Sequence, residues 1–153
     1  MNQTPSLLKH VWLADDDEDD RAFFQDALKE INVPTEVSFS NDGVELMNVL
    51  NHKVQEPPPP HVIFLDLNMP RKNGFECLKE IRSKPKLRSI PIVIFSTTAN
   101  DADISKSYHH GANFYLCKPR TFSHLKKALE KVLQDDLWKY QTQTPRENFF
   151  VTV

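Results

Sequence analysis

Five short apolar runs, separated by stretches of helical periodicity, constrain the fold of this chain more than any other feature. The stretch between the first two runs places Phe24, Ala27, Leu28 and Ile31 at i, i+3, i+4 and i+7, the spacing of one helix face. Runs and helical stretches alternate along the chain, and we expect a strand at each run. The predicted strands are Val11 to Ala14, Val37 to Phe39, Val62 to Leu65, Ile92 to Phe95 and Phe114 to Cys117.

Strict alternation of strands and helices predicts a parallel sheet with helices on both faces. Residues Glu36 to Ser40 alternate apolar and polar, as in an edge strand, whereas the third and fourth runs are apolar throughout, as in the middle of a sheet. We therefore expect a doubly wound α/β fold whose five parallel strands have the flavodoxin-like order 2-1-3-4-5. This order places a topological switch point between the first and third strands, where ligands of open α/β sheets bind.

Helix ends carry recognisable signals. Asp42 precedes Glu45 by three residues and Asn73 precedes Glu76 by three, so each pair is a candidate capping box at a helix start. Gly111 suits the left-handed position just past the end of the fourth helix.

The length of 153 residues leaves room for one folded domain. We expect this domain over residues 1–136 and a tail over residues 137–153 that is too short for a second domain. The tail carries Trp138, Tyr140, Phe149 and Phe150 among polar residues. Because this is much apolar area to leave in water, we expect the tail to dock on a protein surface.

Composition excludes several classes of function. The net charge is -2 with no basic stripe, which argues against direct nucleic-acid binding. No apolar run approaches the roughly 20 residues of a membrane helix, and the first nine residues do not resemble a signal peptide, so we expect a cytoplasmic protein without a membrane partner. Two cysteines are too few for a disulfide framework, and three glycines cannot form a nucleotide-binding loop.

Candidate site residues follow four of the five predicted strands. Asp15 and Asp16 follow the first strand and Asp66 follows the third, while Ser96 and Lys118 follow the fourth and fifth. Carboxylates that meet at one sheet edge repel each other unless a cation lies among them, and an all-oxygen set suits Mg²⁺. With a hydroxyl and an ammonium added, the sequence predicts a site for an oxyanion, most naturally a phosphoryl group.

Each of these residues also has a structural interpretation. The six acidic residues from Asp15 to Asp20 suit a helix N-terminus, Asp66 can form a turn, and Lys118 before Pro119 can simply end a strand. Thr97 and Thr98 are alternatives to Ser96 as the hydroxyl. The placement of all these groups at one sheet edge favours the functional interpretation.

The residues Asp15-Asp16, Phe64 to Pro70 with Gly74 following, Ser96, and Lys118-Pro119 resemble the receiver domain of bacterial two-component response regulators. The resemblance covers Lys9 to Gln134. The acidic run, the aromatic tail and a proline-rich connection before the third strand, Pro57 to Pro60, also resemble the single-domain regulators associated with phytochrome-type histidine kinases. This resemblance implies a receiver domain over residues 1–136 and no output domain.

The resemblance implies a role for each site residue. Asp66 is the implied phosphoacceptor, and Asp15, Asp16, Asp66 and the backbone carbonyl of Asn68 are the implied Mg²⁺ ligands. Lys118 and Ser96 would contact the phosphoryl group. Ser96 and Tyr115 would act as a switch that changes the surface of the fourth helix, fifth strand and fifth helix.

The resemblance also implies the partners. The phosphoryl group would come from a histidine kinase or a phosphotransfer protein, and the signal would pass to a protein target that the sequence does not name. We expect no enzyme activity beyond slow self-dephosphorylation, and a homodimer formed through the fourth and fifth helices.

Two other functions compete with this interpretation. A phosphatase of the haloacid dehalogenase type also uses an Asp at the end of an apolar strand, but that family has a second Asp where this chain has Asn68. A receiver-like binding module that signals without phosphorylation commonly lacks one or more site residues, whereas this chain has all five: Asp15, Asp16, Asp66, Ser96 and Lys118.

Overall fold

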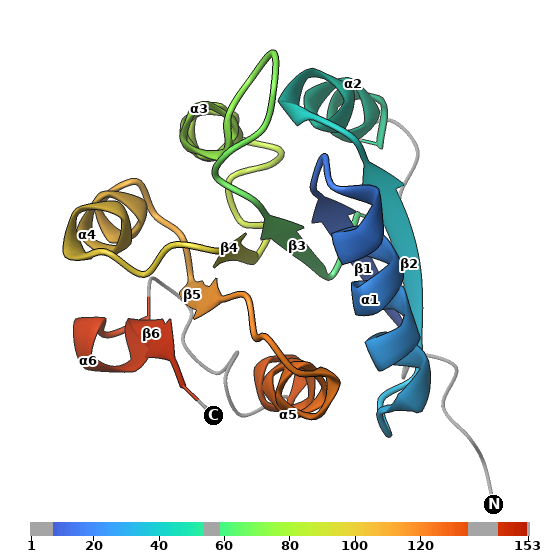
Figure 1. The fold of residues 1–153 in the computed structure, drawn as a ribbon. Coiled ribbons are helices and arrows are strands. Elements are labelled where there is room, and N and C mark those ends of the chain that lie inside the picture. The colour runs from blue at the N-terminus through green and yellow to red at the C-terminus, as the bar shows by residue number, and fades with distance from the viewer. Residues whose placement is uncertain (1–7, 54–58, 135–143, 153) are drawn as a thin grey trace, which may run out of the picture.

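The computed structural model describes residues 8–53, 59–134 and 144–152. Its strands form a single parallel sheet in the order β2-β1-β3-β4-β5-β6, with helices on both faces (Figure 1). The strands are β1 (Lys9–Ala14), β2 (Thr35–Ser40), β3 (Val62–Leu65), β4 (Ile92–Ser96), β5 (Phe114–Cys117) and β6 (Phe150–Val151). The helices are α1 (Glu18–Glu30), α2 (Gly43–Lys53), α3 (Gly74–Ser83), α4 (Asp101–His109), α5 (Phe122–Leu133) and α6 (Arg146–Phe149).

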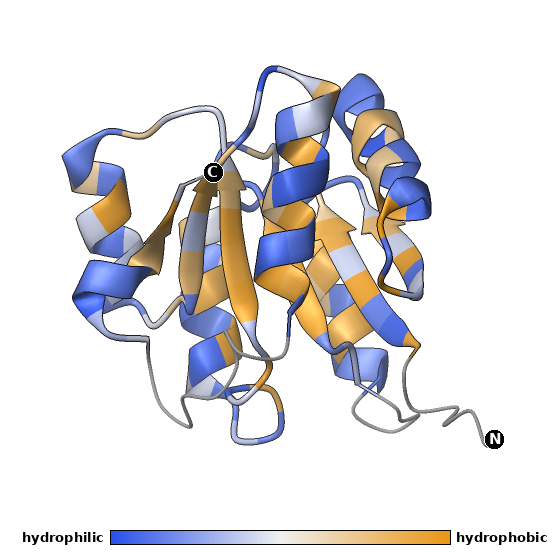
Figure 2. Ribbon diagram, turned by 90° about the horizontal axis from the view of Figure 1, so that it is seen from below, coloured by the Kyte–Doolittle hydropathy of each residue, from blue (hydrophilic) through white to orange (hydrophobic). Residues whose placement is uncertain are grey.

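Two hydrophobic cores lie on opposite faces of the sheet. Helices α1 and α5 pack on one face, where Phe24, Phe64 and Phe95 meet edge to face. Helices α2, α3 and α4 cover the other face, together with the short α6. Figure 2 shows the reason for this layering, since the central strands are apolar along their length whereas the helices alternate apolar and polar stripes.

The predicted doubly wound fold and the order of the first five strands are confirmed, but the sheet has a sixth strand. Phe150 and Val151 form β6, which pairs in parallel with Tyr115 and Leu116 of β5. The predicted number of five was therefore wrong. A two-residue strand is too short to show a period of its own, so the sequence pattern does not predict it. Its position is set by the edge of β5 with which it pairs.

Part of the predicted docking of the tail is also confirmed. Phe149 is completely buried and Phe150 is half-buried. Trp138 and Tyr140 lie outside the described residues.

The predicted capping box at α3 is confirmed, whereas the predicted box at α2 forms only in part, because the Glu45 carboxylate accepts from the Asn41 amide and not from that of Asp42. Asn73 and Glu76 form a reciprocal capping box at the start of α3, and the Asp42 carboxylate accepts a hydrogen bond from the Glu45 amide at the start of α2. Gly111 has a φ of 95° just beyond α4, in the left-handed region that glycine adopts without strain. None of the helices in the described part of the chain is long and apolar enough to cross a membrane.

Arg82 of α3 joins the loops at the end of the sheet where the strands begin. Its guanidinium donates hydrogen bonds to the carbonyl oxygens of Gly111, Arg88 and Ile90 at 2.8–3.0 Å, and to the side-chain oxygen of Asn113 at 2.9 Å. Burial lowers the pKa of Arg82 to about 10. Arg82 therefore satisfies four acceptors, and those of Gly111, Ile90 and Asn113 are partly buried.

We expect Arg82→Met to lower the free energy of unfolding by about 2–4 kcal/mol, because it leaves partly buried carbonyl oxygens without donors. Urea denaturation followed by circular dichroism measures this change. The control is Arg88→Met, which removes an exposed guanidinium nearby and should change stability by less than about 0.5 kcal/mol. Equal stability of the two variants would contradict the assigned role of Arg82.

Candidate functional site

Three carboxylates meet at the carboxyl ends of the two central strands β1 and β3. Ala14 of β1 pairs with Leu65 of β3, so the next residues, Asp15 and Asp66, leave the sheet side by side. Their carboxylate oxygens and that of Asp16 lie within 4.8 Å of one another. Asp15 is completely buried and Asp66 is 6% exposed, whereas Asp16 is exposed. The predicted acidic cluster is therefore present at the topological switch point.

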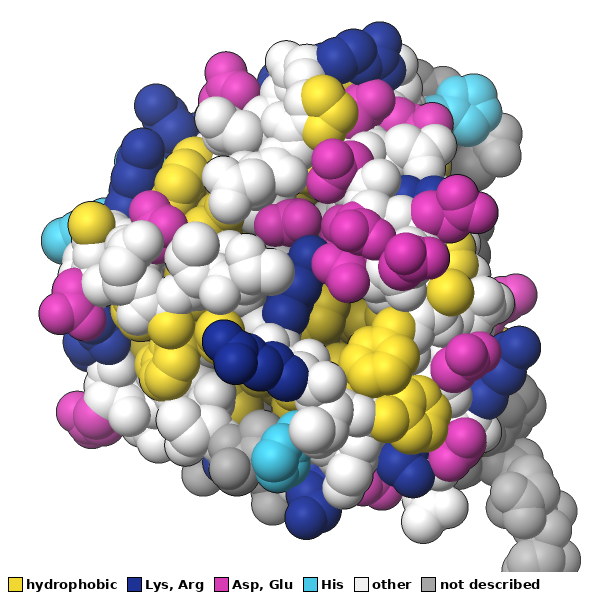
Figure 3. Space-filling model, viewed as in Figure 1, with side chains coloured by type: hydrophobic (Ala, Val, Ile, Leu, Met, Phe, Trp, Pro, Cys, Tyr) yellow, Lys and Arg dark blue, Asp and Glu magenta, His cyan; other side chains and the backbone are white. Residues whose placement is uncertain are grey.

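The ammonium of Lys118 lies among these acids. It donates hydrogen bonds to Asp15 at 2.7 Å, to Asp20 at 2.8 Å and to Asp66 at 3.1 Å. The Lys118 side chain is only 10% exposed, and its backbone amide donates to the carbonyl oxygen of Ser96 at 2.7 Å. Figure 3 shows acidic side chains gathered over the start of α1 and the ends of β1 and β3, with a basic side chain in the hollow beside them.

Burial and neighbouring charges shift the pKa values of both Asp66 and Lys118. Burial raises the pKa of Asp66 to about 6, with a further contribution from the Asp15 charge, although Lys118 opposes this shift. Burial also disfavours the Lys118 ammonium, but its hydrogen bonds to Asp15 and Asp20 outweigh this, so its pKa rises above the ordinary value. At neutral pH Lys118 therefore carries a full positive charge, and ionisation of Asp66 costs free energy because its carboxylate is buried.

The cluster contains more negative charges than positive ones, and the negative charges lie on carboxylate oxygens. One ammonium faces the carboxylates of Asp15, Asp20 and Asp66, with Asp16 at the rim. Carboxylate oxygens without nitrogen or sulfur donors are the ligands that Mg²⁺ and related hard cations prefer. The arrangement can hold a divalent cation next to a nucleophilic carboxylate and a fixed ammonium.

The loop after β3 holds Asp66 rigidly. The Asn68 amide donates a hydrogen bond to the Asp66 carboxylate at 3.3 Å, and Asn68 itself is exposed. Gly74, at the start of α3, packs directly on this loop, because a Cβ atom there would lie 2.3 Å from the carbonyl oxygen of Asp66. A residue larger than glycine would push α3 away from the loop that carries Asp66 and Asn68.

Ser96 and Tyr115 are connected through Thr98. Ser96 is completely buried at the end of β4, and its hydroxyl lies 3.3 Å from the hydroxyl of Thr98. The Tyr115 hydroxyl donates to the carbonyl oxygen of Thr98 at 2.8 Å, and the Thr98 hydroxyl donates to Asp103 of α4 at 3.0 Å. A movement of the loop after β4 would therefore reach both Tyr115 and α4. Thr97, the other alternative to Ser96, is exposed.

Asp20 is a site residue that the sequence analysis did not single out. It lies in the first turn of α1, where Asp17 is the N-cap, so the acidic run caps the helix and also serves the site. Its carboxylate binds Lys118 from the side of the helix. No local signal distinguishes Asp20 within the acidic run, because its contact with Lys118 depends on where the first turn of α1 lies relative to β5.

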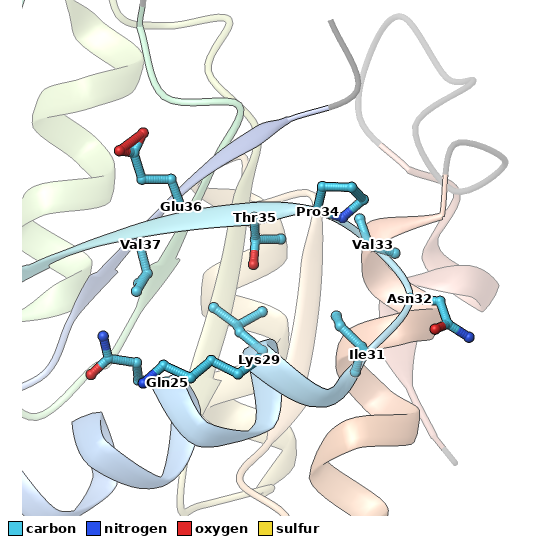
Figure 4. A pocket seen from close by; sticks show the side chains of 10 residues that line it. Gln25, Lys29, Ile31, Asn32, Val33, Pro34, Thr35, Glu36 and Val37 are labelled. Carbon is cyan, nitrogen blue, oxygen red and sulfur yellow. The ribbon is translucent and has the colours of Figure 1, made fainter. Parts of the chain in front are cut away.

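A cavity far from this cluster offers no comparable chemistry. It has a volume of about 610 Å³ and lies between the end of α1 and the start of β2, at the opposite end of the strands (Figure 4). Gln25 and Lys29 line it from the helix, and Glu36 and Val37 line it from the strand. These residues do not form a nucleophile or an acid cluster, so the site at the carboxyl ends remains the candidate.

Comparisons with protein families, with individual proteins and with solved structures all identify the same family. Residues 11–130 match the response regulator receiver domain. The response regulator Rcp1 of Synechocystis sp. is 34% identical over 126 residues, which cover 81% of this chain and 86% of Rcp1.

Two crystal structures are similar to this chain in fold and sequence. The phosphorylated cyanobacterial phytochrome response regulator RcpA has a TM-score of 0.75 and 35% identity, covering 90% of this chain and 98% of RcpA. The Mn²⁺-bound form of Rcp1 has a TM-score of 0.73 and 32% identity, covering 90% of this chain and 99% of Rcp1. These matches favour the receiver interpretation over a haloacid dehalogenase phosphatase. The chain belongs to the family of response regulator receiver domains.

Proposed function

We propose that this protein is a response regulator that accepts a phosphoryl group on Asp66 from a histidine kinase or a phosphotransfer protein. The observation that carries the proposal is the position of the Asp66 carboxylate, 6% exposed at the sheet edge and 3.1 Å from the Lys118 ammonium. In this proposal residues 1–136 form the receiver domain, and the segment that follows is an accessory to it.

The proposed transfer uses one carboxylate oxygen of Asp66 as the nucleophile. This oxygen bonds to phosphorus while the bond from phosphorus to the imidazole nitrogen of the donor breaks, and the electron pair stays on that nitrogen. Lys118 balances the charge of the phosphoryl oxygens, because its ammonium already lies beside Asp66. The loop after β3 keeps the nucleophile from turning away.

The acidic cluster fits a divalent cation. Asp15, Asp16, Asp66 and the backbone carbonyl of Asn68 would hold Mg²⁺, and the support is the close approach of the three carboxylates together with the Mn²⁺-bound structure of the relative Rcp1. When bound, Mg²⁺ supplies positive charge that favours the ionised carboxylates and neutralises the phosphoryl oxygens.

The proposed response to phosphorylation runs through Ser96 and Tyr115. The Ser96 hydroxyl would turn toward the phosphoryl group, and Tyr115 would be held inward by its hydrogen bond to Thr98. The support is the chain of contacts from Ser96 through Thr98 to Tyr115 and Asp103. Helix α4 would then change its position relative to β5.

The similar proteins suggest the wider context. RcpA is a phytochrome response regulator, and we infer that a phytochrome-type histidine kinase is the donor here. Homodimerisation through α4 and α5, slow self-dephosphorylation and a cytoplasmic location stay predictions from the sequence.

Intact mass measurement after incubation with acetyl phosphate tests the proposal. With Mg²⁺ present, we expect one added phosphoryl group, which peptide mapping should assign to Asp66. A chelator should prevent the addition. Addition that persists in chelator, or that maps outside Asp66, would refute the proposal.

Mg²⁺ affinity should distinguish the metal ligands from their neighbours. We expect Asp16→Asn to weaken Mg²⁺ binding at least about tenfold, because it removes a charged ligand. Asp19→Asn is the matched control, since it makes the same change at an exposed position in the first turn of α1 and is not part of the three-carboxylate cluster; it should change the affinity by less than about threefold. Isothermal titration calorimetry measures both affinities, and equal losses in the two variants would contradict the assignment.

A further inference from the structure

The segment of residues 144–152, here called the C-terminal segment, covers the Tyr115 ring. Phe149 is completely buried, and its ring centroid lies 6.4 Å from that of Tyr115 and 5.0 Å from that of Tyr108 in α4. The Phe150 ring lies 6.0 Å from Tyr115. Figure 1 shows α6 and β6 beside β5, between α4 and α5.

Several contacts hold this segment in place. Strand β6 pairs with β5, and the Lys131 ammonium of α5 donates a hydrogen bond to the Thr152 carbonyl oxygen at 2.8 Å. The Arg146 guanidinium lies 5.8 Å from the centre of the Tyr108 ring and 6.0 Å from that of Phe149. The segment is therefore attached to β5, α4 and α5, the elements around Tyr115.

Tyr115 thus has two sets of contacts that belong to different parts of the molecule. Its hydroxyl donates a hydrogen bond to the carbonyl oxygen of Thr98, and the Thr98 hydroxyl contacts that of Ser96 at the proposed phosphorylation site. Its ring packs against Phe149 and Phe150 of the C-terminal segment. Tyr115 has no exposed surface, so an outward rotation of its side chain would have to displace neighbouring rings.

We infer that Phe149 is a positioning residue that holds Tyr115 inward, and that docking of the C-terminal segment and phosphorylation of Asp66 favour each other. This inference rests on the proposed function. If an inward Tyr115 accompanies the phosphorylated site, a contact that stabilises the inward position stabilises the phosphorylated state as well. Linkage then requires that phosphorylation strengthens docking of the segment by the same factor.

Val151 provides a matched control within the same C-terminal segment. Its side chain belongs to the core on the α1 and α5 face of the sheet, whereas Phe149 belongs to the core that contains Tyr115. Both side chains are buried in the same segment. Phe149→Ala and Val151→Ala therefore both truncate a buried side chain of the segment, but only Phe149→Ala removes a contact with Tyr115.

Affinity for beryllofluoride with Mg²⁺, an analogue of the phosphoryl group, tests the coupling without turnover. We expect Phe149→Ala to weaken binding about fivefold or more, and Val151→Ala to stay within about twofold of the wild type. Equal affinities of Phe149→Ala and the wild type, tighter binding by Phe149→Ala, or equal losses in the two variants would overturn the inference.

Hydrogen exchange in the wild-type chain gives a second readout that does not depend on how a variant folds. Beryllofluoride with Mg²⁺ should slow exchange of the amides in residues 146–152 at least about fivefold. Unchanged or faster exchange in a protein that binds beryllofluoride would overturn the inference alone. A wild-type protein that binds no beryllofluoride would instead refute the proposed function.

Discussion

Phosphoryl uptake should fall at least about a hundredfold when Asp66 is replaced by asparagine, because the amide oxygen is a poor nucleophile and a weaker metal ligand. Intact mass measurement in acetyl phosphate and Mg²⁺ follows the reaction. Asp19→Asn is the control, since it makes the same change at an exposed position in the first turn of α1 and should leave uptake unchanged. Uptake by Asp66→Asn at the wild-type rate would show that the assigned nucleophile is wrong.

The same substitution should stabilise the metal-free protein at neutral pH, by roughly 1–3 kcal/mol. The folded-state pKa of Asp66 is raised from 3.8 to about 6, so the folded protein binds this proton more tightly than the unfolded chain does. The cost of ionising Asp66 is absent below about pH 4 and reaches its full size above about pH 6. Thermal unfolding in chelator should therefore show a gain for Asp66→Asn at pH 7 that disappears near pH 4.

Replacement of Lys118 by methionine should lower the free energy of unfolding by about 3 kcal/mol in chelator at neutral pH. The change keeps a side chain of similar length but leaves Asp15 and Asp66 as buried carboxylates without a cation. Mg²⁺ should restore much of the loss, because a bound cation takes over the neutralisation of these groups. Urea denaturation with and without Mg²⁺ measures both effects.

Lys126→Met is the matched control for this experiment. Lys126 of α5 pairs with Glu30 in an ion pair that is largely exposed to solvent, so its loss should cost less than about 1 kcal/mol and should not depend on Mg²⁺. If Lys118→Met is as stable as Lys126→Met in chelator, the buried acids do not need the ammonium. The electrostatic account of the site would then be wrong.

The sequence alone determined the fold class and the main site because both depend on local patterns. Apolar runs and helical stripes are read within ten or fifteen residues, and their alternation leaves few ways to arrange a parallel sheet. Since the carboxyl ends of parallel strands meet at one edge, Asp15, Asp66 and Lys118 could be placed together before any distance was known. The acidic run, however, could not reveal which of its members faces Lys118.

The roles of Asp20, Thr98 and the C-terminal segment depend on how the elements pack in three dimensions. Asp20 enters the site because α1 packs at an angle that brings its first turn over Lys118, and no local pattern encodes that angle. Thr98 connects Ser96 to Tyr115 through hydrogen bonds between segments that are distant in sequence. Strand β6 has two residues and exists because β5 offers a free edge and Phe149 fills a space beside Tyr115. Such contacts depend on how elements pack in three dimensions, which the order of residues in each element does not specify by itself.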